Sequence, residues 1–212
     1  MTQASSLVAD FLDLTSRRLR REPPDMTDAL ANPRGDHTLD DVPLALPLRP
    51  KSAAVLVPVV MRENPTLLLT ERSAQLRQHS GQIAFPGGRV DPTDASIADA
   101  AFREAEEEIG LAARHIGVLG YLDPYLSTTN YLVMPVVAEI APDYTVHLNP
   151  AEVERAFEVP LDFVMDPSHH ELHAREWKGW VRRFYAISYG EHYIWGVTAG
   201  IVRNLYERLY TS

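Results

Sequence analysis

The chain has 212 residues, of which 45% are hydrophobic and 23% charged, as in an ordinary globular protein. It contains no cysteine, which excludes disulfide scaffolds, cysteine nucleophiles and thiolate metal centres. A net charge of −9 argues against broad binding to nucleic acid, and no apolar run approaches the roughly 20 residues of a membrane span. The acidic, polar N-terminus lacks the pattern of a signal peptide, so we expect a cytoplasmic protein.

The first 50 residues are predicted to form a helix followed by a proline-rich connector. An amphipathic pattern predicts the helix over residues 5–20, with arginines near its C-terminal end. Six prolines between residues 22 and 50 disfavour long helices and central strands. We therefore interpret residues 1–50 as a helix and a surface connector, and residues 51–212 as the main domain.

Strands and helices alternate through the main domain. The pattern predicts strands at 53–62, 66–72, 116–122 and 131–140 and a β-hairpin over 181–194. It predicts helices over 96–109, directly after 149 and over 196–210. Ser96 can cap the first of these helices and Gly110 can end it, while Asn149 and Pro150 predict the start of the second. This pattern predicts an α/β fold, which some schemes would call α+β.

A basic loop leads directly into an acidic helix. Residues 71–90 carry a net charge of +2, whereas residues 91–110 carry −6. Glycines in such a loop let backbone N–H groups approach phosphate oxygens, and arginines match the geometry of phosphate. The combination of this loop with the acidic helix suits the binding of a phosphoanhydride.

Three glutamates share one face of the acidic helix. At about 100° per residue, Glu107 and Glu108 both lie within about 60° of Glu104, whereas Glu106 points nearly opposite. Arg103 lies one turn before Glu107 and can donate a hydrogen bond to it. Clustered carboxylates of this kind suit a hard divalent cation such as Mg²⁺ or Mn²⁺.

This helix and the loop before it resemble the Nudix box. The second half of that motif is matched in full by Arg103, Glu104, Ala105, Glu107, Glu108, Gly110 and Leu111. In the first half, the acidic residue six positions after Gly88 is Asp94, and the spacer from Asp94 to Arg103 is one residue longer than usual. Residues 68–88 also resemble the signature that precedes the box in the coenzyme A pyrophosphatase branch, and the resemblance spans about residues 50–205.

The resemblance implies the Nudix fold, an α/β/α sandwich around a mixed β-sheet. It also implies Mg²⁺- or Mn²⁺-dependent hydrolysis of coenzyme A or acyl-CoA to 4′-phosphopantetheine, or its acyl form, and 3′,5′-ADP. We therefore expect the protein to bind this small nucleotide substrate and to bind neither nucleic acid nor a membrane. A homodimer is one option for its assembly. Two alternatives stay open: another dinucleotide-type diphosphate such as ADP-ribose or NADH, and a non-catalytic nucleotide-sensing module.

The resemblance and the residue pattern together assign roles in the site. The expected metal ligands are Glu104, Glu107 and Glu108, and the expected catalytic residues are Glu107, Arg103 and Glu152. The general base stays open between a glutamate of the box and the distal Glu152 or Glu154. The expected substrate-binding residues are Arg72, Arg77, His79, Gly87 and Gly88.

Other residues that could carry chemistry are interpreted as structural. Phe85, Trp195 and Tyr206 are expected in the core. Turn-forming residues at 166–168 favour an exposed loop, rather than a zinc site, for the histidines at 169, 170 and 173.

Overall fold

The computed structural model describes residues 3–31, 33–40, 49–76, 79–177 and 179–211. Its largest sheet is formed by β1 (Lys51–Val60), β2 (Thr66–Arg72), β3 (Ile83–Ala84), β4 (Gly87–Arg89), β5 (Ile116–Tyr121), β6 (Tyr125–Leu126), β7 (Tyr131–Ile140) and β8 (Val153–Pro160). The central order is β3-β2-β1-β7-β5, and β4, β6 and β8 pair with β1, β7 and β2. The long pair of β1 and β7 is parallel and the other pairs are antiparallel, so the sheet is mixed.

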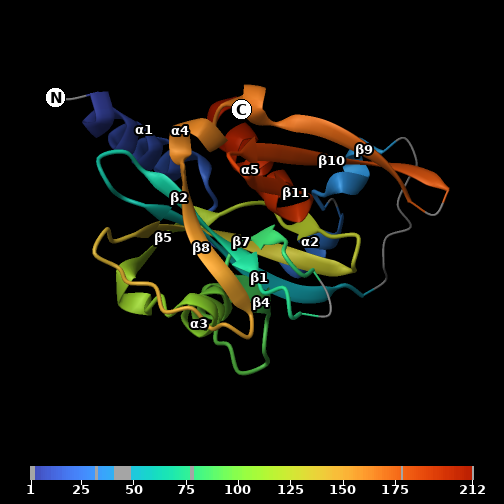
Figure 1. Ribbon diagram of the computed structural model, residues 1–212, viewed down its shortest axis with the longest axis horizontal. Coiled ribbons are helices and arrows are strands. Elements are labelled where there is room, and N and C mark those ends of the chain that lie inside the picture. Colours follow the sequence, from blue (N-terminus) through green and yellow to red (C-terminus); the bar gives the residue numbers. More distant parts are fainter. Residues whose placement is uncertain (1–2, 32, 41–48, 77–78, 178, 212) are drawn as a thin grey trace.

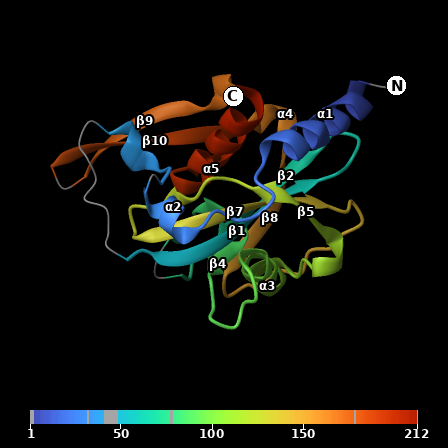
Figure 2. The same ribbon diagram turned by 180° about the vertical axis from the view of Figure 1, so that it is seen from behind.

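Helices cover both faces of this sheet. Helix α3 (Ile97–Ile109) lies on one face (Figure 1). The other face carries α1 (Gln3–Arg18), α5 (Val197–Tyr206) and a three-stranded sheet of β9 (Glu171–Trp177), β10 (Trp180–Tyr189) and β11 (His192–Trp195), as the reverse view in Figure 2 also shows. The short helices are α2 (Met26–Ala31) and α4 (Leu161–Val164), with 3₁₀ turns at Asp36–Leu39, Ala113–His115 and Pro167–His169 and a π turn at Glu207–Thr211. The predicted α/β/α sandwich is confirmed, with a second sheet added to one outer layer.

Strand β1 separates two apolar cores. Successive side chains of a strand point to opposite faces, so a strand covered on both faces must be apolar throughout. Val57 and Val59 pack into the core that includes α1 and α5, whereas Leu56 and Val60 pack into the core that includes α3. All four side chains are fully buried. This central strand therefore fixes both outer layers, and with them the position of α3.

Helix α3 begins and ends as its sequence predicts. The Ser96 hydroxyl accepts a hydrogen bond from the Asp99 N–H at 3.1 Å, and Gly110 takes the left-handed conformation with φ 68°. A Cβ atom on Gly110 would also come within 2.8 Å of His147. The proline-rich stretch likewise contains only α2 and a 3₁₀ turn in its described part, in agreement with the prediction of no long helix.

Two expectations about the C-terminal half are wrong. The helix predicted after Asn149 is a single turn, because the Asn149 carbonyl accepts from Glu152 and Val153 and the chain then pairs with β2 as strand β8. The loop predicted around the three histidines is not wholly exposed, since His170 is buried and His173 lies in β9. Strand β8 forms by pairing with the distant β2, whereas β9 forms a hairpin with the next strand, β10, and His170 packs against Tyr206 of α5. In the described part of the chain, every helix is too short or too polar to cross a bilayer.

Candidate active site

A cavity of about 430 Å³ lies beside β4 and the start of α5. The basic loop contributes Arg72, His79, Gly87, Gly88 and Arg89 to its lining, and the C-terminal segment contributes Trp195, Gly196, Val197, Thr198 and Ile201. Four of the five predicted substrate-binding residues therefore meet at one cavity, and Arg77 lies outside the described residues. Phe85 is in the core as predicted and also borders this cavity, whereas Trp195, which was expected in the core, is only half-buried and lines the cavity.

Glu108 of α3 is directed at the glycine strand β4. Its side chain is only 4% exposed, and its Oε2 accepts a hydrogen bond from the Gly87 N–H at 3.2 Å. Its Oε1 lies 3.8 Å from a terminal nitrogen of Arg72. Burial raises the pKa of Glu108 to about 7, although Gly87 and Arg72 both lower it. The negative charges of Glu104 and Glu152 raise the pKa of Glu108 as well, because they repel its ionised carboxylate.

Glu104 lies against the second glycine of β4. A Cβ atom on Gly88 would come within 2.5 Å of the Glu104 carboxylate, so only glycine lets strand and carboxylate approach this closely. The pKa of Glu104 is raised, mainly by burial, while Arg103 opposes the shift. Gly87 and Gly88 contact the two carboxylates and also line the cavity.

Arg103 joins four groups of the site. Its Nε and Nη2 donate to the two oxygens of Asp94 at 2.9 and 3.1 Å, and its Nη1 donates to Glu104 at 3.0 Å. The predicted bond to Glu107 is present at 3.2 Å, and the Arg89 carbonyl accepts a further bond at 3.1 Å. Such a two-pronged contact with a carboxylate fixes the plane of a guanidinium. Asp94 therefore positions Arg103, a role that only its place six residues after Gly88 could have suggested.

The carboxylates divide into buried and exposed members. Glu107 is 54% exposed, and Glu106 is exposed without a contact to the other three. Across the described ranges, no three carboxylate or imidazole side chains converge on one point, and Arg103 draws Glu104 and Glu107 towards itself. The donor chemistry nevertheless fits a hard divalent cation, because Glu104 and Glu108 offer partly buried anionic oxygens beside a strand without side chains.

Glu152 is the distal carboxylate closest to this group. It is half-buried, and its charge raises the pKa of both Glu104 and Glu108. Asn149 holds it in place, since the side-chain amide donates to Glu152 at 3.2 Å and the backbone N–H donates to the Glu108 carbonyl at 2.9 Å. Glu154 is exposed on β8. Of the two distal candidates for a general base, Glu152 is the one that the fold brings to the site.

The two glycines of β4 should respond differently to alanine. In Gly88→Ala, the new methyl group would push the Glu104 carboxylate aside, and we expect Mn²⁺ to bind about tenfold or more weakly. The melting temperature should change little, because the Glu104 side chain can rotate. In Gly87→Ala, the methyl group would meet the Ala54 carbonyl at a backbone φ of 155°, so folding itself should suffer.

Titration of Mn²⁺ by electron paramagnetic resonance, beside thermal melts, would measure both effects. Unchanged Mn²⁺ affinity in a folded Gly88→Ala protein would contradict the placement of Glu104 at a cation site.

The family model and the curated relatives indicate the same family. Residues 50–181 match the NUDIX domain. A Photorhabdus laumondii protein named "Uncharacterized Nudix hydrolase NudL" is 46% identical over 160 residues, which cover 75% of this chain and 85% of that protein. The Cronobacter sakazakii protein of the same name is 45% identical and covers 74% and 82%. Among solved structures, a Caenorhabditis elegans Ap4A hydrolase complex matches 53% of this chain and 81% of its own, with 22% identity and a TM-score of 0.44.

Proposed function

The chain belongs to the Nudix hydrolase family, and on this premise we propose that it hydrolyses the diphosphate of coenzyme A or an acyl-CoA. Nudix hydrolases act on pyrophosphate bonds and generally use divalent cations such as Mg²⁺ or Mn²⁺. The proposed products are 4′-phosphopantetheine, or its acyl form, and 3′,5′-ADP. The segment from Leu68 to Gly88, with the signature of the coenzyme A branch, supports this choice of substrate because it forms one wall of the cavity.

One observation carries the proposal furthest: Arg72 borders the cavity with an unpartnered nitrogen. Its buried Nε has no hydrogen-bond partner within the described part of the chain. A buried donor without a partner costs about 1–3 kcal/mol, so a bound acceptor would recover that free energy. Arg89 and His79 line the same cavity. An anionic group of the substrate, such as a phosphate, supplies the acceptor that this place lacks.

The proposed division of roles follows from burial and hydrogen bonds. Glu104 and Glu108 would hold the cation, with Glu107 beside them. When bound, the cation neutralises the diphosphate and lowers the pKa of a coordinated water. Arg103, held by Asp94, keeps Glu104 and Glu107 in a fixed orientation. Glu152 or Glu107 would accept the proton of the attacking water, and Glu152 is already oriented by Asn149.

Product analysis on a panel of substrates tests the proposal directly. The panel contains coenzyme A, an acyl-CoA, ADP-ribose and NADH, each with Mg²⁺ or Mn²⁺. We expect coenzyme A or the acyl-CoA to give the highest kcat/KM and to release 3′,5′-ADP. A preference for ADP-ribose or NADH would contradict the proposed substrate but would still support a Nudix hydrolase. The absence of turnover for all four, with tight binding of one, would favour a nucleotide-sensing module instead.

The 3′-phosphate of coenzyme A should be recognised through Arg72. A charge-assisted hydrogen bond contributes about 1.5–3 kcal/mol, so dephospho-coenzyme A should have a kcat/KM about tenfold or more lower than coenzyme A. In the Arg72→Ala variant, the ratio of kcat/KM for coenzyme A to kcat/KM for dephospho-coenzyme A should be closer to one, because the variant has lost the contact with the 3′-phosphate. The ratio cancels any general loss that follows from the nearby Glu108.

Arg155→Ala provides the matched control for this comparison. It removes the same charge from the neighbouring strand β8, where Arg155 pairs with Glu71 and Glu191 outside the cavity. Its ratio should equal that of the wild type. Equal kcat/KM for the two substrates in the wild-type enzyme would rule out a 3′-phosphate site at Arg72.

A further inference from the structure

A segment before the matched domain closes part of the cavity wall. Residues 33–40, here named the strap, are bound to β6 and to the residue before it. The Arg34 N–H donates to the Pro124 carbonyl at 3.1 Å, and the Leu126 N–H donates to the Arg34 carbonyl at 2.7 Å. Gly35 permits this contact, since a Cβ atom there would come within 2.5 Å of the Leu126 carbonyl. The strap is therefore a fixed part of the fold, although it lies outside residues 50–181.

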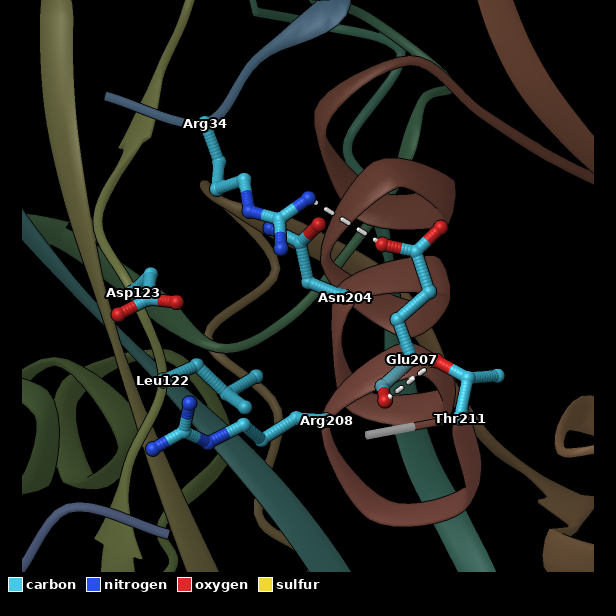
Figure 3. A pocket seen from close by; sticks show the side chains of 7 residues that line it. All are labelled: Arg34, Leu122, Asp123, Asn204, Glu207, Arg208 and Thr211. Atoms are coloured by element: carbon cyan, nitrogen blue, oxygen red, sulfur yellow. Dashed lines mark hydrogen bonds and ion pairs between the residues drawn. The ribbon is translucent and has the colours of Figure 1, made fainter. Parts of the chain in front are cut away.

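Ion pairs fasten both ends of the strap to the C-terminal half. Arg34 pairs with Glu207 at 3.2 Å across a smaller cavity of about 180 Å³, and Figure 3 shows this contact beside Asn204. At the other end, the buried Asp40 accepts hydrogen bonds from the Arg182 side chain at 2.7 Å and the Arg183 N–H at 2.8 Å. The residue between these anchors that reaches the main cavity is Asp36.

Asp36 is held by a buried tyrosine. The Tyr125 hydroxyl donates to Oδ1 of Asp36 at 2.6 Å, and the Tyr125 ring packs under α5 at Gly200, where a Cβ atom would collide with it. The second oxygen, Oδ2, has no partner among the described residues. Burial raises the pKa of Asp36 to about 6, so it is still mainly ionised at pH 7.5 and can accept a further hydrogen bond.

The strand register separates Asp36 from the cationic end of the cavity. Arg89 pairs with Ala53, Ala53 with Val133, and Val133 with Tyr125, so these side chains form one row on one face of the sheet. Three steps between strands span about 14 Å. Arg72 and Arg89 lie towards one end of the lining, while Asp36 is its only acidic member in the described chain. The end of the cavity with Arg72 and Arg89 therefore favours anionic groups, and the end with Asp36 favours hydrogen-bond donors.

We propose that Asp36 determines substrate specificity by accepting a hydrogen bond from a neutral N–H group at the end of the substrate remote from the diphosphate. An anionic group there would be repelled by the carboxylate, whereas an amide or an exocyclic amine matches it. This inference rests on the proposed function. In coenzyme A, the donor is either an amide of the pantetheine arm or the amino group of adenine, and the two products carry one kind each.

Inhibition by the two products separates these sources. The Asp36→Asn variant keeps the shape of the side chain but can present an N–H where the substrate needs an acceptor. We expect its KM for coenzyme A to rise about tenfold with kcat within about twofold. Its inhibition constant should rise about tenfold for one product alone: 4′-phosphopantetheine if an amide faces Asp36, or 3′,5′-ADP if adenine does.

Asp40→Asn is the matched control for loosening of the strap. It breaks the anchor to Arg182 and Arg183 but keeps the Asp36 side chain. It should therefore lower the melting temperature and weaken the binding of both products to the same extent. An unchanged KM in Asp36→Asn, or equal weakening of both products, would overturn the role of Asp36. If the wild-type enzyme neither hydrolyses coenzyme A nor binds either product, the proposed function fails first, which is a distinguishable result.

Discussion

Glu108→Gln should retain less than about one-thousandth of the wild-type kcat. The substitution removes the negative charge of the most buried carboxylate in the box. The glutamine oxygen can still accept the hydrogen bond from the Gly87 N–H, so the shape of the site is preserved. Steady-state kinetics with saturating Mg²⁺ would measure the loss.

Glu106→Gln is the control on the same helix. Glu106 is exposed and points away from the cavity, so its substitution should leave kcat within about twofold. Similar losses for the two variants would contradict the assignment of the functional face.

The loss in Glu108→Gln should not come from unfolding. Its folded-state pKa of about 7 lies above its ordinary value of 4.5, because of burial. Stabilisation from the protonated form is fully present below pH 4.5 and is lost as the pH rises through 7. At pH 8, without a divalent cation, the ionised carboxylate therefore disfavours folding. The variant should melt no lower than the wild type in EDTA at this pH.

Removal of divalent cations should abolish hydrolysis, with a loss of about 10³-fold or more. Glu104, Glu107 and Glu108 bring negative charge to a negatively charged diphosphate, and Arg103 is already engaged by carboxylates. Without a cation, these charges oppose substrate binding. The measurement is the rate in excess EDTA, with restoration by Mg²⁺ or Mn²⁺ as the control.

Thermal melts provide an independent readout of the same site. Mg²⁺ at about 100 times its Kd should stabilise the wild-type protein by about 2.7 kcal/mol. The increase should be much smaller in Glu108→Gln, which lacks a ligand charge. Full activity in EDTA, or equal stabilisation of both proteins by Mg²⁺, would exclude the proposed cation site.

Local patterns predicted the elements whose sequence is strongly periodic or capped. Helix α3 has Ser96 at its start and Gly110 at its end, and both take the expected conformations. The apolar runs of β1 and β7 are long enough to identify buried strands. Strand β8 was missed because Asn149 and Pro150 do begin a turn, and only pairing with β2 makes the following residues a strand. The strands β3, β4 and β6 have two or three residues, too few for a periodic pattern.

The candidate site could be predicted only where one contiguous motif contains it. The box and the loop before it placed Arg72, His79 and the two glycines at one cavity, although their roles stay proposals. Asp94 was identified only by its spacing, because its bond to Arg103 crosses the turn before α3. Asp36 could not be found from sequence at all. It reaches the cavity through contacts with Tyr125, which lies 89 positions further along the chain.

The anchoring of the strap has a consequence for biosynthesis. Asp40 and Arg182 are 142 positions apart, and Arg34 and Glu207 are 173 apart. At about 5–20 residues per second, roughly 7–35 s separate the synthesis of the strap from that of its anchors. Once residue 140 has left the ribosome, a nascent chain can pair β1 with β7, pack α3 and bind the strap to β6, but the residues that anchor the two ends of the strap are not yet synthesised. The wall that contains Asp36 is therefore fastened at both ends only after β10 and the residues beyond α5 have been synthesised.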